Sequence, residues 1–521
     1  MTRVTTFVRA AIVLCLPWLL LLLVLACLRP MAIPDEGRYG ELGRWMWMSG
    51  DWLVPRLDGI PFFHKPPLLY WLESVSVGVL GTHVWSVRLV PMLHAALMGI
   101  GLYTVTRLWV GDTLARRATL MLASSLAFLV GGQYVNHDML VACWISLAIL
   151  CFGWSFASGE TPHAGWARAG FIACALGILS KGLIGLALPG LVLLLWLAWT
   201  RQWTKILRLP WLSGLALFAL IAVPWFVLAE RHYPGMLSYL FGTHQFGRFT
   251  ATTFNNARPW WFYGVAVVVL WGMWLPWVLW SGWQSVRGQS VRVDAGPQVS
   301  TTPQQWSQLR SLAWIWVVAI LGFFSIPNSK LLGYALPVVP ALALLSALGW
   351  GSMSGWRFQR WLWRGLLGLG ALLAVVANHQ AGQFIDKFSS RDVAAALACR
   401  AGPQVPLYVL GGYPYDLPFL AGRQAPLGVM QDWAAIQGQV GDEWRGELLD
   451  GARFDAAAAH VLVPLDRLPS LAAAPGNWLV VAHTALPELA VSLQAFERSV
   501  EGRNWSLYRS AGTPMTTGCT P

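Results

Sequence analysis

A long apolar run, AAIVLCLPWLLLLLVLAC (residues 10–27), is followed closely by PDEGRYGELGRWMWMSGDWLVPRLDGIPFFHKPPLLYW (residues 34–71). The first stretch is long enough to cross a bilayer as a helix, which takes about 20 apolar residues. The second begins with two carboxylates and ends on a His-Lys-Pro-Pro sequence. We therefore expect acidic, basic and aromatic side chains to gather at one membrane surface directly after the first span.

The composition is that of an integral membrane protein. Of 521 residues, 56% are hydrophobic and 12% are charged, whereas soluble proteins carry about 25% charged residues. Repeated apolar runs predict helical spans rather than a barrel, whose strands alternate in short segments. The net charge of +12 does not indicate a nucleic-acid partner, because much of the Lys and Arg falls in short connections between spans.

Apolar runs predict an α-helical membrane domain of the chain over residues 1–379, with about 11–13 transmembrane helices. Between the first two spans, interfacial helices are expected at about 35–80. The expected spans lie at residues 10–29, 84–106, 116–133, 139–157, 166–180, 182–200, 211–229, 260–283, 311–326, 331–349 and 362–378.

The distribution of Lys and Arg predicts the orientation of these spans. With the N-terminus in the cytoplasm, every predicted cytoplasmic connection is basic, as the positive-inside rule requires. The opposite, periplasmic side then receives residues 34–71, the turn at Asn136-His137-Asp138, the segment 230–259 and everything after about residue 380. We expect the chemistry on that side, since its connections are the long and chemically mixed ones.

From about residue 380 the composition changes, and Trp becomes rarer while Asp, Glu, Gln and Ala increase. Residues 391–400 have the pattern of a helix, and short apolar runs at 405–413, 460–464, 478–483 and 505–509 have the pattern of buried strands. We predict a small periplasmic α/β domain over residues 380–521. If this compartment oxidises thiols, Cys399 and Cys519 could form a disulfide, although the sequence does not give the distance between them.

Asp35 and Glu36 are the first candidates for catalysis. A structural interpretation is that Asp35 caps a helix over residues 36–48, with Glu36 near its positive end. However, a carboxylate at the hydrocarbon boundary can also accept a proton from an attacking hydroxyl or hold an acceptor by hydrogen bonds. We favour the functional interpretation, because paired carboxylates at that depth are costlier than a Ser or Asn cap.

Lys65 is the first candidate for binding an anion. As a structural residue it would extend its ammonium to the membrane surface before a helix that starts after Pro67. As a functional residue it would pair with a lipid phosphate, which suits a compact cation at headgroup depth. Other outer loops contribute Arg248, Lys330 and Tyr334, which together predict a shared anionic ligand.

The turn at His137 and Asp138 is compatible with ordinary turn chemistry. As an extra acidic group near Asp35, however, Asp138 could bind an acceptor or, with His64 or His137, a divalent metal. Glu36 is a further candidate for acceptor or metal contact. No cofactor is required by these residues, and a metal stays open.

Several of these segments together resemble a known family. They are PDEGRYGELGRWM, GDWLVPRLDGIPFFHKPPLLYW, the Asp138 turn, HQFGRFT (residues 244–250) and SKLLGYALP (residues 329–337). In the same order, over residues 10–350, they resemble the polyprenyl-phosphate-dependent glycosyltransferases with the membrane-embedded GT-C fold. The likeness is greatest to bacterial lipid A aminoarabinose transferases and related protein-mannosyltransferase-like enzymes.

The resemblance implies roles for the candidate residues. Asp35 would be the principal catalytic carboxylate and Asp138 a second acidic group on the acceptor side. The phosphate of an undecaprenyl-phosphate sugar would be held by Lys65, Arg248 and Tyr334, with Lys330 nearby. Cations aimed at a departing phosphate stabilise its developing charge, and attack from the opposite face predicts inversion at the anomeric carbon. The aminoarabinose transferases carry an acid before the lysine, where this chain has His64, so the sugar and the acceptor stay open.

The sequence thus predicts an inverting glycosyltransferase in the bacterial inner membrane, acting on the periplasmic face. It would move a sugar, with 4-amino-4-deoxy-L-arabinose the one that the resemblance favours, from undecaprenyl phosphate to lipid A or another envelope glycan or protein. One alternative is a mannosyltransferase-like enzyme with a hydroxyl acceptor; others are a transporter or flippase of polyprenyl-linked lipids and a lipid-binding scaffold. Transporters place ionisable residues near the midplane and often show repeated halves, neither of which is prominent here.

Overall fold

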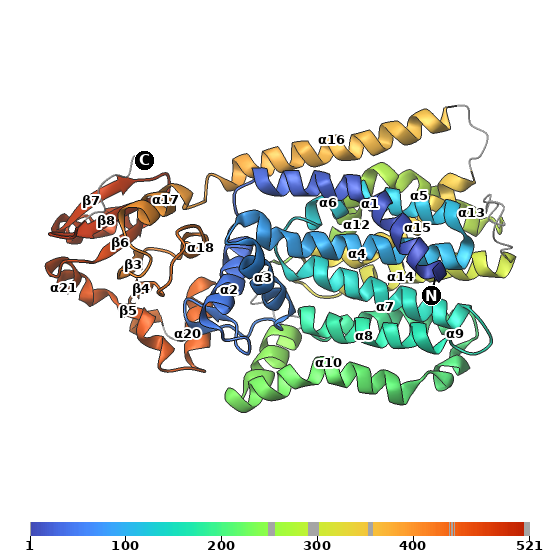
Figure 1. Cartoon of the computed structure of the whole chain (residues 1–521), viewed down its shortest axis with the longest axis horizontal. Helices are drawn as coiled ribbons and strands as arrows, with labels where there is room; N and C mark the ends of the chain where they lie inside the picture. The colour runs from blue at the N-terminus through green and yellow to red at the C-terminus, as the bar shows by residue number, and fades with distance from the viewer. Residues whose placement is uncertain are drawn as a thin grey trace. The chain divides into compact units, whose positions relative to one another are not determined.

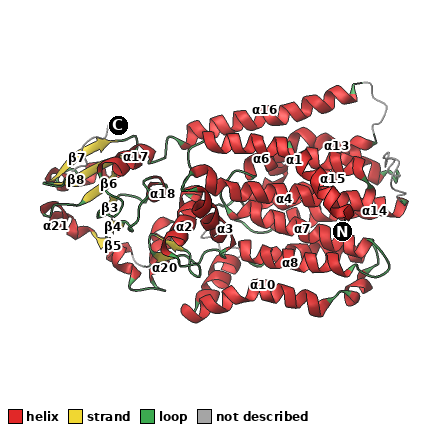
Figure 2. Cartoon of the chain, in the orientation of Figure 1, coloured by secondary structure: helices red, strands yellow, loops and turns green. Residues whose placement is uncertain are grey.

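The computed structural model describes residues 2–247, 256–289, 302–352, 358–436, 438, 441 and 443–514. In this part the chain is mostly helical, with a six-stranded sheet and a two-stranded hairpin (Figure 2). It divides into two compact units. The first comprises Met1–Cys27, Arg88–Leu228 and Leu240–Asn378, and the second comprises Leu28–Val87, Ala229–Tyr239 and His379–Pro521.

The first unit is built from long apolar helices (Figure 1). They are α1 (Thr2–Leu28), α4 (Val84–Val110), α5 (Asp112–Ala123), α6 (Leu126–Gly131), α7 (His137–Ala157), α8 (Ala164–Lys181), α9 (Ile184–Trp199), α10 (Trp211–His232), α12 (Phe262–Trp271), α13 (Leu275–Val286), α14 (Pro303–Ser325), α15 (Val339–Gly351) and α16 (Gln359–Ile385). Shorter helical turns are η1 (Trp203–Arg208), η2 (Ser238–Gly247), η3 (Gly272–Trp274) and η4 (Leu332–Val338). Four helices, α1, α4, α10 and α16, continue past the boundary of this unit.

Eight helical segments of the described chain are long and apolar enough to cross a membrane, which confirms the predicted helical membrane class. Three expected spans are not among the eight, and their positions are taken by α8, by the 16-residue α9 and by the pair α5 and α6. The expected span at 116–133 is broken because Ser125 starts a new helix, its hydroxyl accepting a hydrogen bond from the Phe128 N–H at 3.2 Å. The count of about 11–13 stays a prediction.

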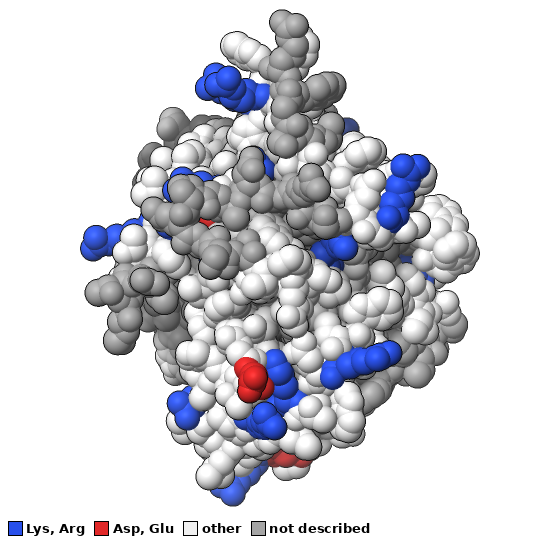
Figure 3. All heavy atoms as spheres, turned by 90° about the vertical axis from the view of Figure 1, so that its right-hand side faces the viewer, with Lys and Arg blue, Asp and Glu red and all other residues white. Residues whose placement is uncertain are grey.

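One end of the first unit is basic. The N-terminus and the ends of α9, α13 and α14 lie together there (Figure 1), and Lys and Arg side chains predominate over acidic ones in the view of that face (Figure 3). Arg107 lies in the last turn of α4, and Arg201, Lys205, Arg208 and Arg287 lie in the segments that follow α9 and α13. They are accompanied by Asp112, in the first turn of α5, and by Glu160. This is the asymmetry that the positive-inside rule expects of one membrane side.

The second unit begins with α2 (Asp35–Ser49), the strands β1 (Arg56–Leu57) and β2 (Ile60–Pro61), and α3 (Leu68–Leu80). The helix α2 agrees with the predicted one to within a residue at each end. It packs against α3 and against the C-terminal part of the chain. Gly37 allows the second contact, because a Cβ there would lie 2.8 Å from the backbone carbon of Tyr415.

The C-terminal part of this unit is an α/β domain, as predicted. Its helices are α17 (Arg391–Arg400), α18 (Leu417–Leu420), α19 (Trp433–Ile436), α20 (Trp444–Ala452), α21 (Leu468–Ala473) and α22 (Leu486–Leu489). Its strands are β3 (Leu407–Leu410), β4 (Gly428–Gln431), β5 (Leu462–Pro464), β6 (Trp478–Ala482), β7 (Phe496–Glu501) and β8 (Trp505–Ser510), in the sheet order β5-β4-β3-β6-β8-β7. Strands β3 to β6 pair in parallel, and β7 and β8 add antiparallel pairs.

Four strands were predicted, while β4 and β7 were not. Every residue of β6 is buried, which produces the continuous apolar run that sequence analysis detects. By contrast, β7 is an edge strand with the sequence FERSVE and is largely exposed. A strand with that many charged residues has no apolar pattern to reveal it.

The hairpin of β1 and β2 is closed by Asp58 and Gly59, whose φ angles are 55° and 82°. Two consecutive positive φ angles define the type I′ turn, for which Asp-Gly is a preferred sequence. The Asp58 carboxylate is buried, and its Oδ1 accepts the backbone N–H of Leu427 at 2.6 Å. The hairpin is thus attached to the C-terminal domain through its turn.

Burial raises the pKa of Asp58 to about 8, with Glu41 adding to the shift and Arg423 opposing it. The pKa of an exposed Asp is about 3.9. At pH values between these two pKa values, the folded chain holds a proton that the unfolded chain has lost. The free energy of unfolding must therefore decrease as the pH rises through this window. Asp58→Asn keeps the acceptor for Leu427 and tolerates the positive φ, but it cannot ionise.

We predict that Asp58→Asn is thermally more stable than the normal chain at pH 8.5, and that this advantage becomes much smaller near pH 5. The measurement is the unfolding midpoint of both purified proteins in detergent across the pH range. A stability difference that does not change with pH would contradict the assigned titration.

Candidate active site

The predicted site residues fall in both units. In the second unit, the two neighbouring carboxylates at the start of α2 have different environments. Glu36 is fully buried, and its carboxylate accepts the fork of Arg29 at 2.8 and 2.9 Å and the Ala32 N–H at 2.7 Å. A buried carboxylate with this many donors is held in place as part of the structure.

Asp35 is the more accessible of the two, with 31% of its side chain exposed. It is the first residue of α2, and the N-cap is Pro34, with no side-chain hydrogen bond at the cap. The capping role considered for Asp35 is therefore wrong. Its Oδ1 instead accepts a hydrogen bond from Nη2 of Arg38, one turn along the helix, at 2.7 Å.

Arg38 connects Asp35 to the C-terminal domain. Its Nη1 contacts Oε1 of Glu447 on α20, and Oε2 of that carboxylate accepts the Tyr415 hydroxyl at 2.8 Å. The guanidinium also lies over aromatic rings, 4.9 Å from the centroid of Tyr39 and 5.5 Å from that of Tyr415. Held by two carboxylates and two rings, Arg38 fixes the direction of the Asp35 carboxylate.

His64 stacks on Phe62, with 4.3 Å between the ring centroids, and its Nε2 lies 2.9 Å from the hydroxyl of Tyr239. Lys65 follows it and is partly exposed. Within the described residues, no group of three or more His, Cys, Asp or Glu side chains is arranged to hold a metal. A metal bound through His64, His137 or Glu36 therefore gains no support from the geometry.

In the first unit, the predicted acid Asp138 lies in the first turn of α7. Asn136 caps this helix by accepting the Asp138 N–H at 2.9 Å, and its own amide donates to Oδ2 of Asp138 at 3.0 Å. Oδ1 contacts Nζ of Lys181 in the last turn of α8, and both side chains are about nine-tenths buried. His137, the preceding residue, is also buried.

Tyr334 completes this cluster. It lies in η4, and Nζ of Lys181 is 4.3 Å from the centroid of its ring. The approach of η4 to α7 depends on Gly333, because a Cβ there would lie 2.0 Å from Oδ2 of Asp138. The structure thus brings Asp138, Lys181 and Tyr334 together, as an ion pair beside a phenol.

The other predicted cations have different outcomes. Nζ of Lys330 is buried and donates to the carbonyl oxygens of Arg258 and Pro327 at 3.0 and 2.5 Å, so it fastens two loop segments together. Gln245 of the HQFGRFT segment accepts the Leu183 N–H at 2.9 Å. Arg248 lies outside the described residues, and its role stays a prediction.

The predicted disulfide is also untested. Cys399 belongs to α17, whereas Cys519 lies outside the described part of the chain. The pairing of these two cysteines stays a prediction.

Two residues of the candidate site, Arg38 and Lys181, were not predicted as site residues. Arg38 stands three residues after Asp35, a spacing at which opposite charges on a helix meet, so the signal was present. The contact of Lys181 with Asp138 joins residues 43 positions apart, and nothing in the sequence specifies that pairing.

The chain is similar to known proteins in both sequence and fold. The family model of dolichyl-phosphate-mannose-protein mannosyltransferases matches residues 8–240. The chain is 30% identical to an undecaprenyl phosphate-alpha-4-amino-4-deoxy-L-arabinose arabinosyl transferase of Aeromonas hydrophila, over 72% of this chain and 67% of the relative. It is also 30% identical to a transferase of the same description from Pseudomonas fluorescens, over 66% of this chain but only 60% of the relative.

The fold is shared with a solved structure. The crystal structure of ArnT from Cupriavidus metallidurans bound to undecaprenyl phosphate superposes with a TM-score of 0.79, covering 98% of each chain at 24% sequence identity. This agreement includes the C-terminal sheet domain as well as the helical part, and it establishes the architecture over nearly the whole chain.

We predict that Gly333→Ala destabilises the chain by about 1–3 kcal/mol, the usual cost of forcing an extra carbon into a packed site. The new methyl group would displace either η4 or the Asp138 carboxylate. Gly322→Ala in α14 is the matched control, because a Cβ there meets nothing within 4 Å and Ala favours a helix. Thermal unfolding in detergent should separate the two variants, and equal midpoints would contradict the close approach.

Proposed function

The chain belongs to the family of membrane glycosyltransferases with the GT-C fold that includes the aminoarabinose transferases, and on that premise we propose that it transfers a sugar from undecaprenyl phosphate to an envelope acceptor. The observation that carries the proposal is the contrast between Asp35 and Glu36. Glu36 is buried and bound by Arg29, whereas Asp35 is partly exposed and directed by Arg38. The exposure of Asp35 supports it, of the two carboxylates, as the one that meets a substrate.

In the proposed reaction, an oxygen of the acceptor attacks the anomeric carbon of the lipid-linked sugar. The bond from that carbon to the phosphate oxygen breaks, and undecaprenyl phosphate departs with the electron pair. Lys65 is the cation that stabilises the negative charge left on the phosphate, with Arg248 as a second one. Attack on the face opposite the leaving group inverts the configuration at the anomeric carbon.

The role of Asp35 depends on the acceptor. A hydroxyl acceptor needs a base, and Asp35 would take its proton as the new bond forms. A phosphate of lipid A is already a nucleophile, so Asp35 would then orient the sugar or the acceptor rather than deprotonate it. The ion pair of Asp138 and Lys181 beside Tyr334 supplies further polar groups in the first unit.

The substrates are proposed from the relatives. The aminoarabinose transferases of Aeromonas and Pseudomonas support undecaprenyl-phosphate 4-amino-4-deoxy-L-arabinose as the donor and lipid A as the acceptor. The eight apolar helical segments and the basic end of the first unit (Figure 3) support a multi-pass protein of the bacterial inner membrane. In this orientation the N-terminus is cytoplasmic, and both the reaction and the C-terminal domain are periplasmic.

We predict that Asp35→Asn lowers sugar transfer by about 100-fold, the cost of losing the group that orients a reactant, while binding of undecaprenyl phosphate is retained. The assay uses membranes supplied with undecaprenyl-phosphate aminoarabinose and lipid A, followed by mass spectrometry of the lipids. Glu488→Gln, an exposed carboxylate of α22, is the control and should transfer normally.

Normal turnover by Asp35→Asn would remove the catalytic role. A normal chain that binds undecaprenyl phosphate but transfers no sugar to any envelope acceptor would instead favour the scaffold, and movement of the intact lipid across the membrane would favour a flippase.

A further inference from the structure

The helix α20 and the turn that follows it, up to Asp455, contact the loop that leads to Lys65. The backbone approach is close, because a Cβ on Gly451 would lie 2.3 Å from the carbonyl oxygen of Pro61 and 2.5 Å from a methyl carbon of Ile60. Only glycine fits such a contact without displacement. This part of the C-terminal domain therefore lies directly on strand β2.

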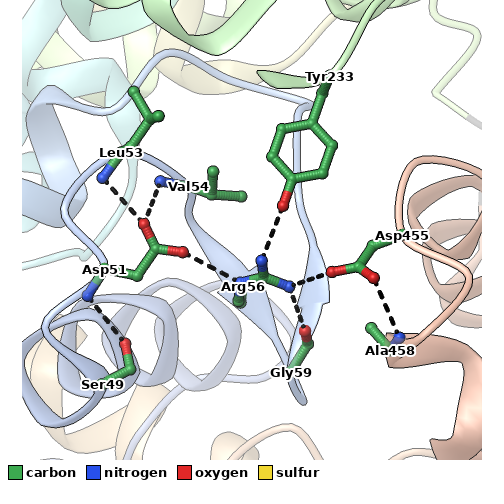
Figure 4. Close-up of polar contacts among 9 residues, drawn as sticks. All are labelled: Ser49, Asp51, Leu53, Val54, Arg56, Gly59, Tyr233, Asp455 and Ala458. Atoms are coloured by element: carbon green, nitrogen blue, oxygen red, sulfur yellow. Dashed lines mark hydrogen bonds and ion pairs between the residues drawn. The ribbon is translucent and has the colours of Figure 1, made fainter.

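Arg56, at the base of the hairpin, joins four segments of the second unit (Figure 4). Its guanidinium donates to Asp51 at 3.2 Å, to the Gly59 carbonyl oxygen at 2.9 Å, to Asp455 at 2.9 Å and to the Tyr233 hydroxyl at 2.8 Å. All three nitrogens of the guanidinium are used. Only the planar, five-donor fork of arginine can satisfy this many partners at once.

The acidic partners of Arg56 are themselves fixed. Oδ1 of Asp51 accepts the N–H groups of Leu53 and Val54, and Oδ1 of Asp455 accepts the N–H of Ala458 at 3.2 Å. The hydrogen bond from Arg56 is the main reason that the pKa of Asp455 is lowered. This carboxylate therefore stays ionised throughout the neutral range.

A second polar contact lies at the other end of the loop. The hydroxyl of Tyr239 donates to Oδ2 of Asp450 on α20 at 3.2 Å, and its oxygen lies 2.9 Å from Nε2 of His64. Since the single phenol proton goes to Asp450, the phenol oxygen accepts the Nε2–H of His64. Burial raises the pKa of Tyr239 well above its ordinary value, so the phenol keeps that proton.

Aromatic rings fill the space between these two polar contacts. Phe63 lies 5.4 Å from Tyr233 and 5.2 Å from Phe454, which in turn lies 5.4 Å from Tyr239. Phe63 and His64 immediately precede Lys65, and two prolines with restricted φ angles follow it. The backbone at Lys65 is thus constrained from both sides by groups of the C-terminal domain and of residues 233–239.

We propose that Asp450 and Asp455 of the C-terminal domain hold the Lys65 loop in its phosphate-binding position, with Arg56 and His64 as positioning residues that act through that loop. The inference rests on the proposed function, because it assigns the domain a part in binding the donor phosphate. In this arrangement His64 is a hydrogen-bond donor to Tyr239 rather than a metal ligand. The C-terminal domain thereby becomes a component of the donor site, through the position that it gives to Lys65.

The test compares Asp455→Asn, Arg56→Gln and Tyr239→Phe with the normal full-length chain in detergent. The measurements are the KM for the lipid-linked sugar, kcat, and binding of undecaprenyl phosphate. We expect the KM to rise and the binding to weaken by about tenfold or more, since a small misplacement of a binding group is costly, while kcat changes less. The double variant of Arg56→Gln and Asp455→Asn should bind the donor no worse than the poorer single variant. The reason is that Arg56→Gln already removes the ion pair with Asp455.

Two controls separate positioning from stability. Asp455→Glu keeps the carboxylate and should recover most of the donor affinity. Arg498→Gln removes an exposed ion pair with Glu501 in the same domain and should leave the donor KM unchanged. If Arg56→Gln does not fold, Asp455→Asn and Tyr239→Phe carry the test, since each is nearly isosteric with the normal residue.

The inference is overturned if the normal chain transfers sugar and the variants keep the normal donor KM and lipid affinity, even when their unfolding midpoints fall. A normal chain that transfers no sugar would instead reject the proposed function, which makes the two failures distinguishable.

Discussion

A buried charge needs a partner, because burial of an isolated ion costs several kcal/mol in lost hydration. The described carboxylates of α2 and α7 follow this constraint closely. Glu36 binds Arg29, Glu41 binds Arg44 with two hydrogen bonds of 2.6 Å, and Asp138 contacts Lys181. The accessible member of this set is Asp35. It is also paired, with Arg38, but 31% of its side chain stays exposed.

The same constraint explains how much of the fold could be predicted. Long apolar helices can be predicted from the sequence, because a bilayer requires about 20 apolar residues in succession. The breaks between such helices have weaker sequence signals. The break at Ser125 depends on one hydroxyl that caps α6, and the exposed edge strand β7 has no apolar pattern. Helix α17 was predicted with its observed bounds, since its pattern is local. The long apolar helices and α17 were found, whereas the helix break at Ser125 and the edge strand β7 were not.

The residues of the candidate site also differ in how far they could be predicted from the sequence. Residue types and their order predicted Asp35, Lys65, Asp138 and Tyr334 as site residues, because the proposed chemistry at a membrane surface needs such groups. The contacts with the C-terminal domain could not be identified in this way, since Arg38 and Glu447 are 409 positions apart and Arg56 and Asp455 are 399 apart. The Asp58-Gly59 turn was an available signal, and it would have located the hairpin that the C-terminal domain contacts.

His64 concerns both the resemblance to the family and the contacts made by the C-terminal domain. The aminoarabinose transferases, which this chain resembles, carry an acid at this position, whereas this chain has an imidazole ring. In this chain the ring stacks on Phe62 and donates to Tyr239, whose hydroxyl reaches the carboxylate of Asp450. An acid is therefore still connected to the residue before Lys65, but it belongs to the C-terminal domain and acts through a phenol. In the proposed arrangement, this difference from the aminoarabinose transferases changes how Lys65 is held and leaves the cation itself in place.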